Sequence, residues 1–348
     1  MNKVILFFGV IFLLSSGLFA GSCSPCREVY PDQFSVRGNK IVDSREQEII
    51  FRGVAAVDPL HQVINAAEDE AVWSEEYFRS IASWGATLVR VPIHPQQWQA
   101  NSLEENFRIL DQTLSWIAEN NMYAIIDFHS IGYPPAEDFE SSNDGIYLTT
   151  IEEWKQFWRD MAFHYQSNKT VVFYELFNEP VFSGYSQDAQ TVYPSRRDWL
   201  AWRTCQEDLI KDIRVIDHNK IIIVSGLSWA YDISFAGKDP IRANNIVYAT
   251  HPYPNSNWNT SWGDAFGKLK EKYPVMVTEF GFEITGDKAE VKYKGLHRYR
   301  DDIIRYLEDK KISWVAWSFS NKWMPALLSD KNGNPNEAGH FFRDKLRQ

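Results

Sequence analysis

Two glutamates stand at the ends of two apolar stretches of the chain. Glu179 follows residues 171–177, with Asn178 between them, and Glu279 follows residues 274–278. Apolar side chains at consecutive positions are typical of a strand that is buried on both faces inside a parallel sheet. Parallel strands end at the same edge of their sheet, so the two carboxylates can face each other across a pocket. A facing pair of carboxylates is the arrangement that hydrolyses glycosidic bonds.

The elements that must position this pair alternate along the chain. We expect eight core strands, at residues 48–55, 86–93, 122–129, 171–179, 220–227, 245–253, 274–280 and 312–319. Helical patterns lie between most of them; residues 103–120, for example, carry Phe107, Leu110, Leu114 and Ile117 at helical spacing. Eight strand–helix alternations without a break in composition predict a single (β/α)8 TIM barrel, in which the carboxyl ends of the strands carry the chemistry.

Further segments complete the predicted barrel. Residues 34–43 predict a short N-terminal β-hairpin at the amino-terminal end of the barrel. Residues 131–150 and 181–195 are rich in turn-forming residues, and we expect them to be loops around the mouth. A doubly wound sheet is the alternative α/β fold, but it would need a glycine-rich phosphate loop after the first strand, and Gly53-Val54-Ala55 offers none.

The composition indicates one large acidic domain. The chain has 348 residues, of which 44% are hydrophobic and 15% aromatic, and this is enough for one barrel core. Lys and Arg number 36 against 46 Asp and Glu, which gives a formal net charge of −10. An acidic chain without a basic run is poorly suited to nucleic acid or to an anionic membrane surface. We expect no nucleic-acid partner, no cofactor and a monomer.

The first residues have the layout of an export signal. One early lysine precedes a long apolar run, and small residues follow it. This layout predicts a signal peptide at residues 1–22, a catalytic domain at residues 23–348, and a secreted or extracytoplasmic protein. The stretch Ala20-Gly21-Ser22-Cys23 resembles a bacterial lipoprotein cleavage site, at which lipid on Cys23 would anchor the protein to the membrane. Plain cleavage near Ala20 with free secretion is the alternative.

Polar, titratable or aromatic side chains recur at the carboxyl ends of the predicted strands. Besides the two glutamates they are Arg90, His129, Asn178, His251, Tyr253 and Trp317. A core strand carries polar residues where they are paired or used. Taken singly, Arg90 could form a core ion pair, and either histidine could be a satisfied structural residue. Their recurrence at one end of the barrel favours a shared site.

The same residues fall into motifs that resemble glycoside hydrolase family 5, the retaining β-glycanases that include many cellulases and β-mannanases. The resemblance covers about residues 48–343 and is carried by Leu88-Val89-Arg90-Val91-Pro92, His129, Asn178-Glu179-Pro180, His251, Tyr253, Thr278-Glu279-Phe280-Gly281 and Trp317. It implies an eightfold barrel, Glu179 as the acid/base and Glu279 as the nucleophile.

The resemblance also implies roles around the carboxylates. Glu179 must be protonated to donate to the leaving oxygen, and Glu279 must be ionised to attack the anomeric carbon. Two neighbouring carboxyls resist ionising together, so we expect Arg90 and Tyr253 to favour the charge on Glu279. The resemblance implies that Asn178 contacts the 2-hydroxyl of the sugar. It also implies that His129, His251 and Trp317 contact the same sugar.

Two acidic residues near the site are expected to be structural. We expect Asp127 to point to the face opposite His129. Glu175 is expected on the same side of its strand as Glu179, one level deeper, as a supporting partner.

The tryptophans of the chain form two groups. Those at helical spacing are expected in the core: Trp84, Trp116, Trp154 and Trp158. Those near strand ends or in loops could stack on sugar rings: Trp98, Trp229, Trp258, Trp262, Trp317 and Trp323.

These observations predict a secreted retaining endo-β-1,4-glucanase that hydrolyses β-linked polysaccharide by double displacement. The motifs around Arg90 and Glu179 resemble the cellulase branch of the family, and an endo-β-1,4-mannanase or another β-glycanase of the family is the alternative. A non-catalytic carbohydrate-binding barrel would lack one of the glutamates. A metal-dependent hydrolase would need clustered metal ligands, whereas the histidines are scattered singly along the chain. Cys23 and Cys26 have the spacing of a metal-binding pair, but there is no second pair to complete a site, so we expect no metal site.

Overall fold

The computed structural model describes residues 33–140, 145–182, 193–254, 261–283 and 296–348. The predicted signal peptide at residues 1–22, Cys23 and Trp258 lie outside these ranges. Within them, no helix combines the length and the apolar character that crossing a membrane requires.

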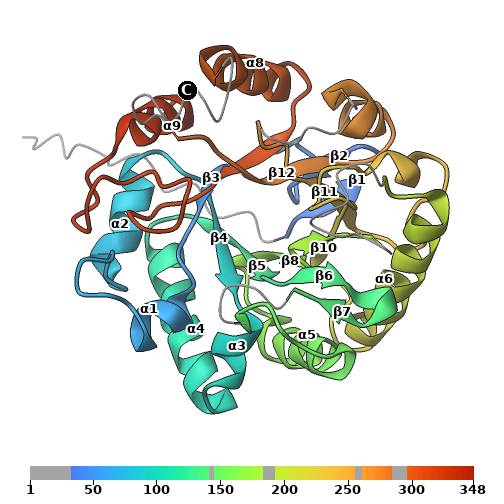
Figure 1. The fold of residues 1–348 in the computed structure, drawn as a ribbon, viewed down its shortest axis with the longest axis horizontal. Helices are drawn as coiled ribbons and strands as arrows, with labels where there is room; N and C mark the ends of the chain where they lie inside the picture. Colours follow the sequence, from blue (N-terminus) through green and yellow to red (C-terminus); the bar gives the residue numbers. More distant parts are fainter. Residues whose placement is uncertain (1–32, 141–144, 183–192, 255–260, 284–295) are drawn as a thin grey trace, which may run out of the picture. The chain divides into compact units, whose positions relative to one another are not determined.

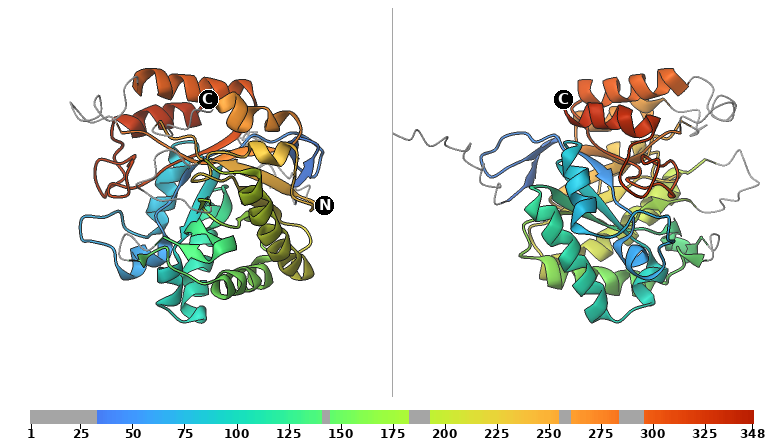
Figure 2. Two further views of the ribbon diagram at one scale, coloured as in Figure 1. Left: turned by 45° about the vertical axis from the view of Figure 1, so that its right-hand side comes forward. Right: turned by 90° about the vertical axis from the view of Figure 1, so that its left-hand side faces the viewer.

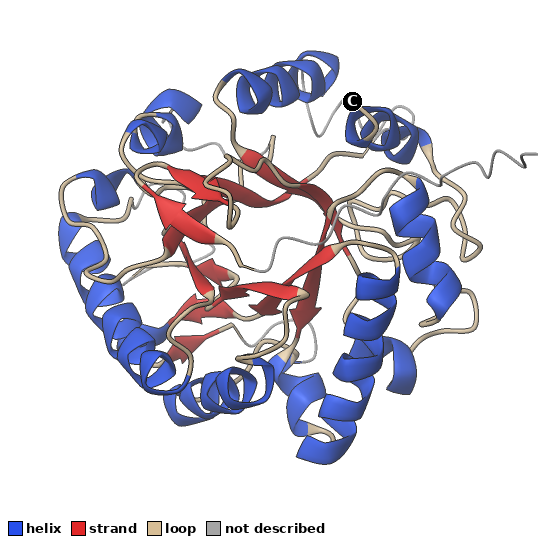
Figure 3. Cartoon of the chain, turned by 180° about the vertical axis from the view of Figure 1, so that it is seen from behind, coloured by secondary structure: helices blue, strands red, loops and turns tan. Residues whose placement is uncertain are grey.

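Eight parallel strands close into a barrel, which confirms the predicted fold (Figures 1 and 3). In chain order they are β3 (Arg52–Ala55), β4 (Leu88–Ile93), β5 (Tyr123–Phe128), β8 (Val171–Glu175), β10 (Ile221–Ser225), β11 (Ile246–Thr250), β12 (Val275–Phe280) and β13 (Ser313–Ala316). The last strand closes the ring on the first, with Val315 opposite Gly53. Apart from Arg52, every residue of these strands is buried, as expected of a parallel sheet that helices cover.

Helices surround the ring of strands (Figure 3). They are α1 (Pro59–Ile64), α2 (Glu75–Ser83), α3 (Pro95–Gln99), α4 (Leu103–Glu119), α5 (Ile151–Tyr165), α6 (Arg196–Ile216), α8 (Leu296–Asp309) and α9 (Glu337–Leu346). Thr150 and Ser195 start α5 and α6 with capping boxes. The helix expected at residues 262–272 is instead a π-helical turn, Gly263–Gly267, followed by a 3-10 turn, Leu269–Glu271. Two glycines disfavour a regular α-helix there.

The fourth strand differs from its prediction. Its barrel ladder ends at Glu175 rather than at Glu179. Glu179–Pro180 forms β9, which pairs with β6 (Ile131–Tyr133), and β7 (Asp138–Phe139) completes a small sheet in a segment predicted to be a loop. The backbone N–H of Glu179 donates to the carbonyl of Ser130 at 3.1 Å. After β8 leaves the barrel, the chain therefore runs beside the segment that follows β5.

Buried tryptophans fix the backbone where β8 leaves the barrel ladder. The indole N–H groups of Trp154 and Trp158 both donate to the carbonyl of Leu176, at 2.7 and 3.0 Å. Both rings are fully buried, as predicted, and so is Trp84, while Trp116 is partly buried against the core. Because the two donors lie on α5, this helix positions the segment that carries one of the two glutamates.

The N-terminal β-hairpin lies at the amino-terminal end of the barrel, as predicted. It consists of β1 (Ser35–Arg37) and β2 (Lys40–Val42), which pair antiparallel. The ring of Phe34 lies 5.3 Å from that of Phe51 and 4.9 Å from that of Tyr123, and both partners stand where core strands begin. Figure 2 shows the hairpin at one end of the barrel and the sheet of β6 and β7 at the other.

Candidate active site

Arg90, on β4, is the centre of the candidate site. Its guanidinium contacts four side chains: Nε lies 2.6 Å from Glu175, Nη1 2.8 Å from Glu279, and Nη2 2.8 Å from Asn178 and 3.0 Å from Asp127. Burial lowers the pKa of Arg90, but the surrounding carboxylates outweigh this and hold it above its usual range. A buried, fully paired guanidinium fixes the positions of its partners, because a buried charge without a partner is costly.

Glu279, at the end of β12, receives two hydrogen bonds. Arg90 donates to one carboxylate oxygen and the hydroxyl of Tyr253 donates to the other, each at 2.8 Å. Burial raises the pKa of Tyr253 well above its usual range, and the charge of Glu279 adds to the effect, so the hydroxyl remains a donor. Both bonds favour an ionised carboxylate, as nucleophilic attack requires.

Glu179, on β9, lies opposite Glu279. One oxygen of each carboxylate and one nitrogen of His251 all lie within 4.8 Å of one another. Burial raises the pKa of Glu179, the charge of Glu279 adds to this, and the hydrogen bond with His251 opposes it; the net shift is upward. A raised pKa keeps the proton that a general acid donates.

His251 connects the two carboxylates to a deeper layer of the site. Its Nδ1 lies 3.1 Å from Glu179 and its Nε2 lies 3.0 Å from the hydroxyl of Thr278, which in turn donates to Glu175 at 2.5 Å. Burial lowers the pKa of His251, but the charge of Glu279 and the interactions with Glu175 and Glu179 raise it to about 9. Burial raises the pKa of Glu175, but Arg90 and His251 outweigh it, and the net shift is downward. Glu175 therefore supports the site from below, as an ionised partner of two cations.

Thr278 and Glu279 both point into the barrel although they are neighbours on one strand. Alternation along a regular strand would send them to opposite faces. The pairing of β12 with β13 changes register between Val277 and Phe280, which is a bulge-like irregularity. Bulges re-aim side chains next to active sites, and this one adds a hydroxyl to the site that the sequence pattern did not indicate.

Asp127 corrects one of our expectations. It does not point away from His129: its Oδ2 lies 2.6 Å from Nδ1 of His129 and 3.0 Å from Arg90. The two residues are two positions apart at the end of β5, and strand alternation places such residues on the same face. Burial lowers the pKa of His129 well below its usual range, as do the nearby His94 and Arg90, so the ring is neutral. The ring of Trp317 stacks on it, with centroids 5.1 Å apart and planes at 3°.

The structure thus brings together every residue that the sequence analysis placed in the site. Hydrogen bonds, ion pairs or ring stacking link them through Arg90, Asp127 and the two glutamates: Arg90, His129, Asn178, Glu179, His251, Tyr253, Glu279 and Trp317. They come from six core strands and the segments after them, all at the carboxyl-terminal end of the barrel.

The family model for cellulases, glycosyl hydrolase family 5, matches residues 42–323 of the chain. The chain belongs to glycosyl hydrolase family 5. A β-glucanase of Saccharophagus degradans, also solved in complex with cellotetraose, is 33% identical, with a TM-score of 0.79 over 90% of this chain and 93% of that one. The catalytic domain of a Thermobifida fusca endoglucanase shares the fold, with a TM-score of 0.70 at 21% identity over 91% of this chain and 98% of that one.

Curated relatives of this family 5 chain are longer than the chain itself. An endoglucanase of Clostridium saccharobutylicum is 24% identical over 88% of this chain and 61% of its own length. Endoglucanase A of Butyrivibrio fibrisolvens is 26% identical over 84% of this chain and likewise 61% of its own length. The chain therefore spans about three fifths of the relatives that it matches.

The tryptophans expected to stack on sugar rings lie in different parts of the family 5 barrel. Trp323 lies at the mouth, with its ring 5.0 Å from that of His94 and its N–H on Glu70. Trp229 is half-buried in the loop after β10, and Trp262 packs against Tyr299 and Tyr306 on the outside. Trp98 lines a different pocket, between α3, α4 and α5. Trp323 and Trp317 therefore share the mouth of the site, while Trp98 and Trp262 do not.

One group of residues in this family 5 site has the spacing to hold a cation. Glu179, His251 and Glu279 offer ligand atoms within 4.8 Å of one another. Protein groups already occupy these side chains, since His251 pairs with Glu179 and with Thr278, and Tyr253 donates to Glu279. The trio is thus satisfied as a hydrogen-bonded acid–base network.

Proposed function

We propose that this chain is a retaining endo-β-1,4-glucanase. The observation that carries the proposal is the approach of Glu179 and Glu279: one oxygen of each carboxylate lies within 4.8 Å of the other. Retaining glycosidases hold their carboxyl groups about 5–5.5 Å apart, whereas inverting enzymes leave about 6.5–9.5 Å for a water molecule. The short separation supports double displacement through a covalent intermediate.

The surroundings of each carboxylate support a division of roles. Glu279, ionised and held by Arg90 and Tyr253, attacks the anomeric carbon while protonated Glu179 donates its proton to the leaving oxygen. The glycosyl–enzyme bond forms as the glycosidic bond breaks. Glu179, now a carboxylate, then takes a proton from water, which displaces Glu279 and restores both groups. Asn178, whose side-chain oxygen is held by Arg90, is placed to contact the sugar 2-hydroxyl through its remaining N–H groups.

A β-glucan substrate is supported by the relatives. The β-glucanase of Saccharophagus degradans, solved with cellotetraose, is 33% identical, and the curated relatives are named endoglucanases. Glucose and mannose differ only at the 2-hydroxyl, and a site that hydrogen-bonds one orientation discriminates against the other because its polar groups lose their partners.

The experiment compares carboxymethylcellulose and barley β-glucan with glucomannan and galactomannan at equal enzyme loading, with release of reducing ends as the readout. We expect the glucans to be hydrolysed faster, with a fall in viscosity that precedes most of the reducing-end release, as internal cleavage requires. Faster hydrolysis of galactomannan would overturn the assignment to glucan and leave the double displacement standing.

We also propose that the protein acts outside the cytoplasm. The support is the lysine, apolar run and small residues at positions 1–22, together with Ala20-Gly21-Ser22-Cys23, at which a lipid could be attached. Large polymers cannot enter a cell before they are cleaved, so export suits an enzyme that hydrolyses polysaccharide.

A further inference from the structure

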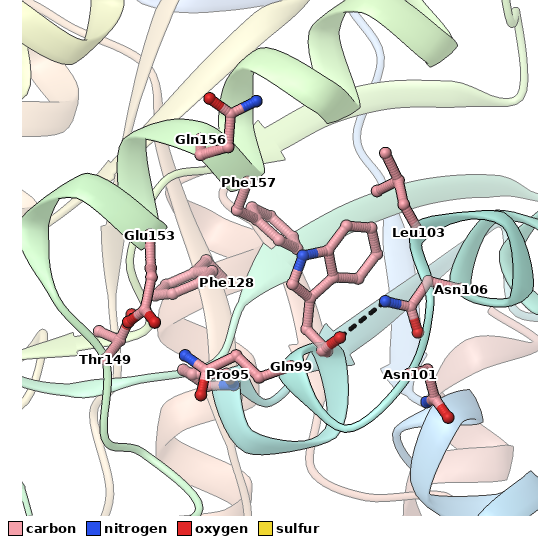
Figure 4. Close-up of a pocket in the computed structure, with 11 residues that line it drawn as sticks. Pro95, Gln99, Asn101, Leu103, Asn106, Phe128, Thr149, Glu153, Gln156 and Phe157 are labelled. Atoms are coloured by element: carbon pink, nitrogen blue, oxygen red, sulfur yellow. Dashed lines mark hydrogen bonds between the residues drawn. The ribbon is translucent and has the colours of Figure 1, made fainter.

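A second pocket opens away from the catalytic carboxylates, between α3, α4 and α5 (Figure 4). Its volume is about 430 Å³, within the range of about 300–1,000 Å³ that small-molecule sites occupy. Pro95 and Trp98 of α3, Asn106 of α4 and Phe157 of α5 contribute to its walls. Its position, size and mixed lining make it a candidate binding site outside the catalytic centre.

Strand alternation separates this pocket from the catalytic site. Phe128, at the end of β5, lines the pocket, whereas Asp127 and His129 on either side of it face the barrel interior and contact Arg90 and Trp317. Adjacent residues of one strand thus serve two different faces. The pocket lies outside the strand ring at the same end of the barrel as the catalytic residues, and none of its lining residues belongs to the catalytic set.

One buried polar atom of the pocket, Oδ1 of Asn106, lacks a partner among the residues that the structure describes. Asn106 is 1% exposed, its amide N–H donates to the carbonyl of Trp98 at 2.7 Å, and its Oδ1 has no donor. Figure 4 shows this oxygen turned away from the Trp98 carbonyl. A buried acceptor without a donor is costly, and a hydroxyl group can supply one.

The lining is amphipathic and carries no positive charge. Glu153 is the one charged residue that lines the pocket, and its Oε2 already accepts from the backbone N–H of Thr150 at 2.9 Å. Without a lysine or arginine in the lining, the pocket is unsuited to a phosphate or a carboxylate ligand. Amide side chains of Asn101 and Gln156 stand around the apolar surfaces of Trp98 and Phe157. Hydroxyls on the edge of a ring and C–H groups on its faces match such a lining.

We propose that this pocket is a second saccharide-binding site, which holds a short segment of the β-glucan chain while another segment occupies the catalytic site. This inference rests on the proposed function for the identity of the polymer. The site would raise the local concentration of substrate at the enzyme, because a polymer held at one place is presented to the other at a high effective concentration.

The test is isothermal titration of the full chain carrying Glu179→Gln with cellotetraose. We expect two binding events, of which Trp98→Ala removes one and leaves the other. In parallel, affinity electrophoresis through barley β-glucan should show retention that falls about tenfold in Trp98→Ala. Trp262→Ala is the matched control, because Trp262 is also partly buried and packs against Tyr299 and Tyr306 on the outer surface, so its loss should leave retention unchanged.

If Trp98→Ala fails to fold, the double variant Asn101→Ala/Gln156→Ala changes only the rim and should reduce the same binding event. A single binding event that neither variant alters would overturn the proposal. Trp98-dependent binding in a wild-type protein that hydrolyses no β-glucan would refute the proposed function and leave the pocket as a saccharide site. Hydrolysis of β-glucan without Trp98-dependent binding would refute the pocket alone.

Discussion

Nδ1 of His251 lies 3.1 Å from Oε1 of Glu179, so a buried group that is cationic at neutral pH sits against the proposed general acid. Burial raises the pKa of Glu179, and the hydrogen bond with His251 lowers it. The position of the alkaline limb of the activity profile is therefore a balance between these two effects.

Replacing His251 with Asn removes the cation and should raise the pKa of Glu179 further. A proton held more tightly by Glu179 keeps the acid form present at higher pH, so the alkaline limb of kcat/KM should move upward by about one pH unit. Activity at the optimum should fall by about 10²-fold or more, because the geometry of the acid is lost. The control is His164→Asn, which replaces an exposed histidine paired with Asp111 and should leave the profile unchanged. A downward shift would contradict the balance.

Glu179→Ala and Glu279→Ala should reduce activity on β-glucan and on an aryl cellobioside to different extents. Without Glu179, hydrolysis of β-glucan should fall by about 10²–10⁴-fold, while an aryl cellobioside whose leaving group needs no proton should be affected far less in the glycosylation step. Without Glu279, both substrates should be lost, because no covalent intermediate can form. Rates on the two substrates distinguish the roles, and proton NMR of the first product should show the retained anomer. An inverted anomer would exclude double displacement.

Glu175→Gln should destabilise the protein and also slow catalysis. Glu175 is fully buried and pairs with Nε of Arg90 at 2.6 Å, so its neutralisation leaves part of a buried positive charge uncompensated. Breaking a buried pair costs about 3–5 kcal/mol, an upper range here because Arg90 keeps three other acceptors. The measurement is urea unfolding together with kcat on the aryl cellobioside.

The matched control for this substitution is Glu105→Gln, which removes an exposed partner of Arg108. Exposed pairs contribute about 0–1 kcal/mol, so its free energy of unfolding should remain close to that of the wild type. Equal stability of the two variants would show that Glu175 does not hold Arg90 in place.

The two tryptophans that share the Leu176 carbonyl should behave non-additively. Trp158→Phe and Trp154→Phe each leave one donor on that carbonyl, so each loses one hydrogen bond worth about 0.5–1.5 kcal/mol and some packing. The double variant leaves the buried carbonyl without a side-chain donor. We expect its loss in free energy of unfolding to exceed the sum of the single losses by about 1 kcal/mol or more. Simple additivity in a denaturant double-mutant cycle would argue against a shared anchor.

Export makes a prediction that mass spectrometry can check. Protein isolated from its native host should lack residues 1–22 or a similar leader. If lipid is attached, the mature amino terminus is Cys23 with added acyl mass. An intact Met1 would exclude export, and an unmodified mature terminus would exclude the anchor alone.

Much of the fold and of the site was predictable because the relevant signals are local. Runs of consecutive apolar residues predict strands that are buried on both faces. Eight such strands alternating with helices predict a closed (β/α)8 barrel. Parallel strands put their carboxyl ends together, so Arg90, Glu179 and Glu279 were assigned to one site without knowledge of their distances. The orientation of Asp127 was also predictable, because it lies two positions before His129, and strand alternation places both side chains on one face.

Only the tertiary structure decided the remaining features, because they depend on contacts between segments that are distant in the sequence. The pairing of β9 with β6 ends the barrel ladder early, and the register change in β12 turns Thr278 inward beside Glu279. The shift of the His251 pKa to about 9 depends on three glutamates, from β8, β9 and β12, that folding places around its imidazole ring. The pocket at Trp98 arises in the same way, since three helices meet there around a side chain whose surroundings no local pattern describes.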